Sequence, residues 1–160
     1  MIKFALVFLV ALSLVGIGYF LYLGRASQSG KAPGLVSGNL APCPATPNCV
    51  SSDDTSDPGQ AIAAFAFDSK AVAPAEAWSR LQEIVNSLPG VRVVEVSDEY
   101  LSAECRSRLF GFVDDLEFHL RPDSSSIAVR SASRVGHSDL GANRKRVENL
   151  RAQFQAAFSR

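Results

Sequence analysis

The stretch that decides the fold is residues 100–146, which read YLSAECRSRLFGFVDDLEFHLRPDSSSIAVRSASRVGHSDLGANRKR. Polar and apolar residues alternate through much of it, and a period of two is typical of β-strands with one buried face. Gly111 and the PDSSS run leave room only for short connections, so neighbouring strands are predicted to pair antiparallel. The predicted strands are 100–110, 112–121 and 126–135.

The alternation divides the side chains of these strands between an apolar face and a charged face. The apolar parity holds Leu101, Ala103, Cys105, Leu116, Phe118, Leu120, Ile127, Val129 and Ser131. The other parity holds Glu104, Arg106, Arg108, Asp115, Glu117, His119, Arg130 and Arg134. Asp114 falls on the apolar parity, and a bulge beside Gly111 is expected to turn it outward.

The flanking elements complete an α+β fold. Residues 61–67 and 91–96 are predicted as further strands. Helical spacing after Pro74 and again near the C-terminus predicts two helices packed on the sheet. The resulting order, β-α-β-β-β-β-α, predicts one curved antiparallel sheet, similar in architecture to TATA-binding-protein-like and helix-grip folds. The residues that mark the helices are Trp78, Leu81, Ile84, Val85 and Leu88, and Val147, Leu150, Phe154 and Phe158.

The N-terminus carries a hydrophobic segment. After a flank at 1–3, residues 4–23 are uncharged and apolar over a length that spans a bilayer as a helix. This predicts a transmembrane signal anchor. A cleaved signal peptide is the alternative, but it needs a shorter apolar core and a small-residue cleavage site, and no clean site follows Leu23. Residues 24–41, rich in Gly, Ser, Ala and Pro, are expected to be a flexible linker to a globular domain at 42–160.

The charge is balanced, with 16 basic and 16 acidic residues. Nucleic-acid binding has no support from net charge. Residues 101–160 hold ten bases and seven acids, a mild basic bias that is compatible with an anionic partner.

Two cysteines, Cys43 and Cys49, enclose a proline-containing loop, CPATPNC. Proline stiffens the loop, and a disulfide there would persist only in an oxidising compartment. Free thiols with a packing role, a partial metal site and a redox pair are the alternatives, but a zinc site needs four ligands and redox pairs more often have two residues between the thiols. Cys105 is expected to be a buried small apolar residue.

Three motifs in the same order carry a resemblance to a known family. They are CPATPNCVSS, ECRSRLFGFVDDLEF and RSASRVGHSDLGANRKRVE. Together they resemble an uncharacterised family of bacterial and plastid domains of unknown function, with the catalogue number 1499, over about residues 40–158. The resemblance implies an N-terminal membrane segment or export signal in bacterial relatives. It implies no reaction and no catalytic residues.

The charged face admits more than one interpretation. A solvated ladder of cross-strand ion pairs is the simplest. Alternatively, the start of the last helix offers backbone N–H groups beside several guanidinium groups, a combination that binds carboxylate or phosphate. The candidate ligand-binding residues are Arg106, Arg108, Asp115, Glu117, Arg130, Arg134, Ser138, Asp139, Asn143 and Arg144.

Two enzymatic interpretations find less support. Asp115, Glu117 and His119 share one strand face, but successive side chains on a face stand about 6.5–7 Å apart, too far to meet one metal ion without a bend. His137, Ser138 and Asp139 are the residue types of a catalytic triad, but adjacent residues rarely point at one another. No catalytic residue, metal site or cofactor is assigned.

The sequence therefore predicts a single-pass protein of the inner (cytoplasmic) membrane with its soluble domain in the periplasm. We expect a binding or envelope-structural module with an Arg-rich anion site. Its expected partners are the membrane, through the N-terminal helix, and an anionic small molecule, a lipid headgroup or an envelope protein. The alternative is a hydrolase-type or metal-dependent enzyme that uses the charged sheet face.

Overall fold

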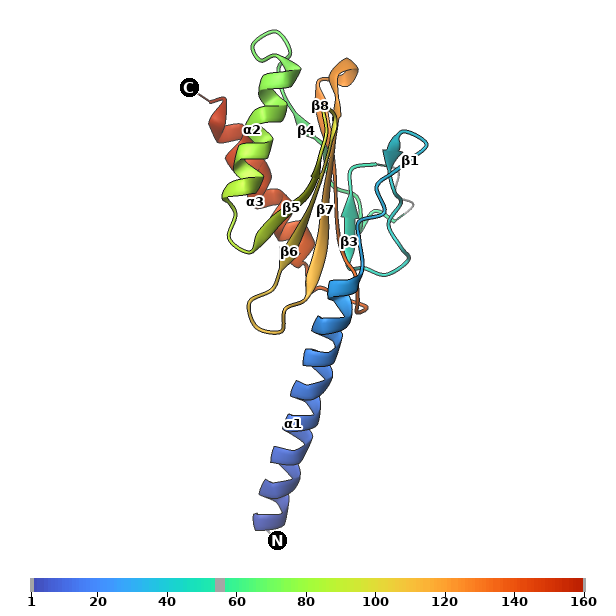
Figure 1. The fold of residues 1–160 in the computed structure, drawn as a ribbon, viewed down its shortest axis with the longest axis vertical. Coiled ribbons are helices and arrows are strands. Elements are labelled where there is room, and N and C mark those ends of the chain that lie inside the picture. The colour runs from blue at the N-terminus through green and yellow to red at the C-terminus, as the bar shows by residue number, and fades with distance from the viewer. Residues whose placement is uncertain (1, 54–56, 160) are drawn as a thin grey trace.

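The computed structural model describes residues 2–53 and 57–159, and it is an α+β fold built on one antiparallel sheet (Figure 1). Within the described residues, the strand order in the sheet is β3-β8-β7-β6-β5, and β4 also pairs with the start of β8. The strands are β3 (Cys49–Ser51), β4 (Phe65–Ala66), β5 (Val91–Val96), β6 (Tyr100–Arg106), β7 (Val113–Arg121) and β8 (Ser126–Ser133). The predicted fold class is confirmed, and β3 is an addition that the sequence did not suggest.

Two helices, α2 (Pro74–Ser87) and α3 (Ala142–Ala157), cover one face of the sheet (Figure 1). Pro74 stands in the first turn of α2, where its missing N–H removes no helical hydrogen bond. Phe65 packs edge-on against Phe118 of the sheet and Phe154 of α3. The predicted apolar parity of the strands and the predicted apolar faces of the two helices form this core: Leu101, Leu116, Phe118, Ile127, Val129, Leu81, Val85, Val147, Leu150 and Phe154 are all buried.

Asp114 keeps the helix-facing parity of β7, so the expected outward bulge is wrong. The pairing of β6 with β7 is regular from Tyr100 opposite His119 to Arg106 opposite Val113. The Asp114 carboxylate meets Arg146 of α3 with an Nη2–Oδ2 distance of 2.6 Å. Asp114 can therefore stay on the helix-facing side of the sheet, because the ion pair with Arg146 compensates its charge there.

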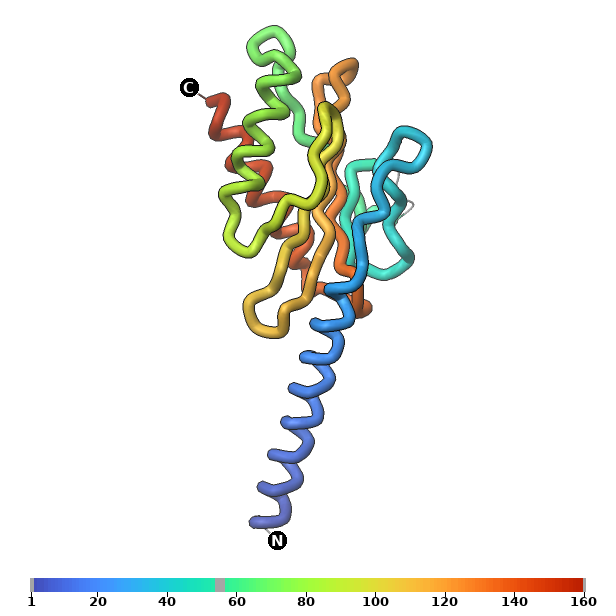
Figure 2. The backbone as a smooth tube through the Cα atoms, viewed as in Figure 1, coloured from blue at the N-terminus to red at the C-terminus, as the bar shows by residue number. Residues whose placement is uncertain are grey.

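The N-terminal helix α1 (Ile2–Ala26) projects from one end of the domain, as the tube in Figure 2 shows. Within the described residues, it is the one helix long and apolar enough to cross a membrane. Its last turn stays in contact with the domain, where Gly24 is buried.

Residues 27–40 lie on the face of the sheet opposite the two helices (Figure 1), and the chain then joins the sheet as its edge strand β3. They contain a 3-10 turn, η1 (Ser27–Ser29), and a small hairpin of β1 (Leu35–Val36) and β2 (Asn39–Leu40). Residues 24–41 were expected to be a flexible linker. In the structure their backbone and side chains bond to the sheet, because the buried charged groups beneath them need hydrogen-bond partners.

Candidate functional site

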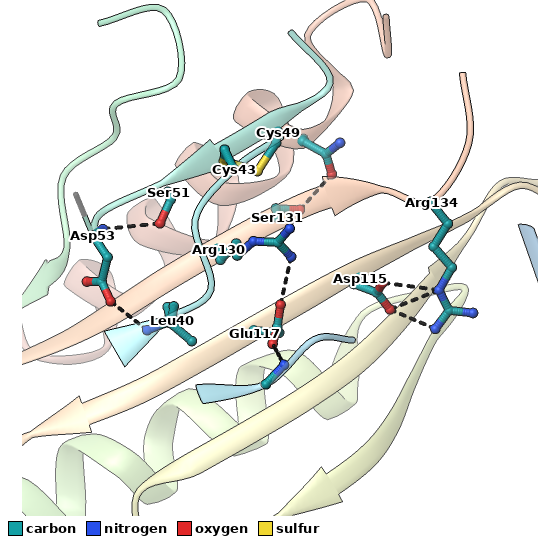
Figure 3. A network of polar contacts seen from close by, with 12 residues as sticks. Leu40, Cys43, Cys49, Ser51, Asp53, Asp115, Glu117, Arg130, Ser131 and Arg134 are labelled. Atoms are coloured by element: carbon teal, nitrogen blue, oxygen red, sulfur yellow. Dashed lines mark hydrogen bonds and ion pairs between the residues drawn. A yellow bond between two sulfur atoms is a disulfide. The ribbon is translucent and has the colours of Figure 1, made fainter. Parts of the chain in front are cut away.

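The charged face of the sheet holds a buried ion pair between Glu117 of β7 and Arg130 of β8. Glu117 is 0% exposed and Arg130 is 6% exposed. Their Oε2 and Nη1 atoms are 2.8 Å apart (Figure 3). The second carboxylate oxygen of Glu117 accepts hydrogen bonds from the Tyr100 hydroxyl at 2.8 Å and the Gly34 N–H at 2.9 Å. A carboxylate removed from water is retained only with such a set of donors.

Tyr100 serves as a donor in this group. Burial raises the pKa of the Tyr100 hydroxyl well above its usual value, and the negative charge of Glu117 raises it further. The phenol therefore stays protonated and donates to the carboxylate. Gly34 reaches the same oxygen from the covering segment, so residues 27–40 complete the donor set.

Arg134, just beyond β8, forms a second ion-pair group with Asp115 and Glu104. Its Nη2 lies 2.7 Å from Asp115 Oδ1, and its Nε contacts both Asp115 oxygens (Figure 3). The same Nη2 lies 3.0 Å from Glu104 Oε1. The Ser27 carbonyl accepts from its Nη1 at 3.2 Å. Burial alone would lower the pKa of Arg134, but the hydrogen bonds that it donates to Asp115 and Glu104 outweigh burial and raise the pKa. Each of the three nitrogens of this guanidinium thus donates to a group within the chain.

An open cleft of about 430 Å³ lies at the β5–β6 end of the same face. It is lined by Gln28, Gly90, Val91, Arg92, Glu104, Arg106 and Val113. Glu104 accepts from Arg92 at 2.7 Å as well as from Arg134. Burial raises the pKa of Glu104, yet the hydrogen bonds from Arg92 and Arg134 bring it below its usual value.

Arg106 is the charged residue of this cleft that has no ion-pair partner among the described residues. Its side chain is exposed and makes no ion pair with any residue that the structure describes. The other guanidiniums of the charged face, Arg92, Arg130 and Arg134, each have a carboxylate partner. Arg106 therefore offers a free forked donor at the rim of a polar hollow.

The start of α3 lies on the other side of the sheet from these groups. Asp139 accepts the N–H of Gly141 at 3.1 Å and that of Asn143 at 2.7 Å. Ser138 accepts the Leu140 N–H, and Arg144 donates to the carbonyls of Gly59 and Ala61. The chain's own groups thus occupy the helix start.

The ten candidate residues consequently separate into several places. The structure brings Asp115, Glu117, Arg130 and Arg134 together in the buried network, with Arg106 at its open edge. Arg108 is exposed in the loop between β6 and β7. Ser138, Asp139, Asn143 and Arg144 lie at the helix start, apart from that network.

Comparison with known protein families gives a match over most of the domain. A family model described as a protein of unknown function, DUF1499, matches residues 39–154, well over half of the chain. The chain belongs to the DUF1499 family. No curated protein and no solved structure matches it. The resemblance drawn from the three motifs is therefore confirmed at the level of the family.

The disulfide of this DUF1499 domain joins Cys43 to Cys49, with the Cα atoms 5.7 Å apart (Figure 3). It holds Asn48, whose carbonyl accepts from Ser133 N–H at 3.0 Å and from Asn143 Nδ2 at 3.0 Å. Cys105 is a free, buried thiol. Burial raises its pKa to about 11, which leaves it protonated near neutral pH.

Sequence reasoning about the DUF1499 domain missed Tyr100, Gly34, Ser27, Gln28 and Arg92 as parts of the polar face. Tyr100 carried a signal, because its parity is that of Glu104 and Arg106. Gly34 and Ser27 carried none, since they act mainly through backbone groups of a non-periodic segment. Among the described residues, no group of three His, Cys, Asp or Glu side chains could hold a metal ion.

Proposed function

We propose that the chain is a membrane-anchored binding module of the cell envelope, in which the cleft beside Arg106 receives an anionic group. The observation that carries the proposal is the exposed Arg106 guanidinium at the rim of that cleft, which forms no ion pair with any described residue. Arginine presents several donors in a planar fork that suits carboxylate and phosphate. Gln28 adds a neutral polar side chain on the same wall.

The placement in the envelope has two supports. Helix α1 has the length and composition of a membrane span, and the Cys43–Cys49 disulfide is a bond of oxidising compartments. We therefore assign α1 as a single-pass signal anchor in the inner membrane, with the domain in the periplasm. Alkylation of the protein in intact cells, followed by mass spectrometry, tests whether the Cys43–Cys49 disulfide forms in the cell. Free Cys43 and Cys49 thiols would contradict a periplasmic domain.

Anion binding is tested by calorimetry and thermal unfolding of the full chain in detergent micelles. Inorganic phosphate, sulfate and succinate are the probes, with chloride at matched ionic strength as the blank. At 100 times its dissociation constant, a bound anion stabilises the fold by about 2.7 kcal/mol. Arg106→Gln is expected to weaken binding by roughly 10- to 100-fold, from the loss of a charged hydrogen bond of about 1.5–3 kcal/mol.

Arg80→Gln is the matched control, because Arg80 is an exposed arginine on α2 whose one ion pair among the described residues is with Glu83, three positions on in the same helix. It should bind the probes as the unaltered chain does. An absent response to all three anions, or equal affinities in the Arg106 and Arg80 variants, would remove the proposed site.

A further inference from the structure

Two loops of the domain lie at the end from which α1 leaves (Figures 1 and 2). One joins β6 to β7 at residues 107–112, and the other joins β8 to α3 at residues 134–141. Each presents a large apolar side chain to solvent: Leu109 is 79% exposed and Leu140 is 97% exposed. Outside α1, no described large apolar residue is more exposed than these two.

The β6–β7 loop contacts α1 at a defined position along the helix, around Phe20. The Phe110 ring stacks on Phe20 with centroids 5.3 Å apart, and Phe112 meets the same ring edge-on at 6.4 Å. The backbones also approach closely, since a Cβ on Gly24 would lie 1.9 Å from the Phe110 carbonyl oxygen. Gln28 Nε2 donates to the Gly111 carbonyl at 3.4 Å.

This contact position on α1 lies near the C-terminal end of the apolar segment. Phe20 precedes the last residue of the uncharged run, Leu23, by three positions. At a rise of 1.5 Å per residue, that is about 4.5 Å along the helix axis. If α1 spans a bilayer, the loop tip must lie in the interfacial layer and not in bulk water.

The charges around the loop suit that layer. Arg25, Arg106 and Arg108 are all exposed at this end. Arginine side chains near a membrane surface extend their guanidinium groups to lipid phosphates while their stems lie along apolar groups. Leu109 follows Arg108 directly, so one loop offers both an apolar insert and a phosphate contact.

We propose that the loops at 107–112 and 134–141 dip into the interface of the membrane that holds α1, with Leu109 and Leu140 inserted among the lipids and Arg108 on their phosphates. The partner is the lipid surface itself. The domain then rests on the bilayer with its sheet upright and does not swing freely from a tether. The inference rests on the proposed anchor, but not on anion binding in the cleft.

Spin labels on the full chain in phosphatidylcholine–phosphatidylglycerol nanodiscs test it. Single cysteines are placed by Ser13→Cys in the middle of α1, Leu109→Cys in the loop and Ser124→Cys in the β7–β8 turn at the opposite end. Cys105 is buried and Cys43 and Cys49 are paired, so the unaltered chain is the labelling blank. Collision rates with oxygen, which partitions into lipid, and with a water-soluble nickel chelate report the depth of each label.

The expected ratio of oxygen to nickel collisions is highest at 13, intermediate at 109 and lowest at 124. A ratio at 109 equal to that at 124, with 13 in lipid, would overturn the loop insertion and leave the anchor standing. A water-exposed label at 13 would overturn both. The separate outcomes distinguish this inference from the proposed function.

A second measurement guards against perturbation by the label. Leu109→Trp in vesicles of the same lipids with brominated acyl chains should lose fluorescence by quenching. The native Trp78 is 5% exposed and lies on α2, so the unaltered chain provides the baseline. Quenching of the variant no greater than that baseline would contradict the proposal.

Discussion

Glu117 shows at the scale of one residue why the charged face is not a solvated ladder. The side chain is fully buried, and three donors, from Arg130, Tyr100 and Gly34, share its two oxygens. An exposed pair on a sheet contributes little, about 0–1 kcal/mol. A buried pair contributes through the cost of breaking it, because the remaining charge has no water to solvate it.

Arg130→Met should therefore destabilise the domain by about 3–5 kcal/mol, since it strands the Glu117 carboxylate. Urea unfolding of the full chain in micelles, followed by Trp78 fluorescence, measures the loss. The control Arg80→Met breaks an exposed pair and should cost less than about 1 kcal/mol. The double variant Glu117→Gln/Arg130→Met keeps an acceptor for Tyr100 and Gly34 without the charge. It should be more stable than Arg130→Met alone, and equal or greater loss in the double variant would refute the buried-charge argument.

The loop before β3 shows how a local covalent bond stabilises contacts between elements distant in sequence. The Cys43–Cys49 bond closes a short loop, and the Asn48 carbonyl within it accepts from Ser133 at the end of β8 and from Asn143 of α3. Cys49 itself pairs with Ala132 in the sheet. Loss of the bond frees the backbone that carries this carbonyl.

Cys43→Ser/Cys49→Ser is expected to lower the free energy of unfolding by about 2–4 kcal/mol, because the unfolded chain regains the loop's conformational freedom. Thermal or urea unfolding measures the change. Dithiothreitol should destabilise the unaltered chain by a similar amount and leave the double variant unaffected. If dithiothreitol also destabilised the double variant, the loss of stability would have a cause other than reduction of this disulfide.

At the scale of the whole molecule, the junction of α1 with the domain depends on one close backbone contact. Gly24 is buried against the Phe110 carbonyl, and Ser27, three residues on, accepts the Val113 N–H at 2.9 Å. A Cβ on Gly24 has no room, and the neighbouring atoms are backbone that cannot turn aside. The orientation of the domain relative to the helix thus follows from the absence of a side chain.

Gly24→Ala should loosen this junction without unfolding the sheet. Spin labels at positions 13 and 124 of the same chain, in nanodiscs, give the distance distribution across the junction, which we expect to broaden. Gly16→Ala is the matched control, because nothing lies within 4 Å of its Cβ position. Equal distributions in the two variants would show that the contact does not orient the domain.

Local patterns predicted most of the fold. Parity alone placed Leu101, Leu116 and Val129 on the core face, because a strand alternates its side chains whatever surrounds it. Pro74 likewise marked the start of α2, since proline is tolerated in the first turn of a helix. The same alternation put Glu117, Arg130 and Arg134 on one face. It could not show whether that face meets water.

The sequence by itself determined the anchor-length helix, the two-faced antiparallel sheet and the family. Only the tertiary structure decided that residues 27–40 cover the charged face and that Arg106, beside a cleft, forms no ion pair with the described residues. The physical reason is that periodicity reports how a side chain lies relative to its own strand. Burial and pairing of a charge depend on backbone groups such as those of Gly34 and Ser27, which lie far away in sequence and have no pattern of their own.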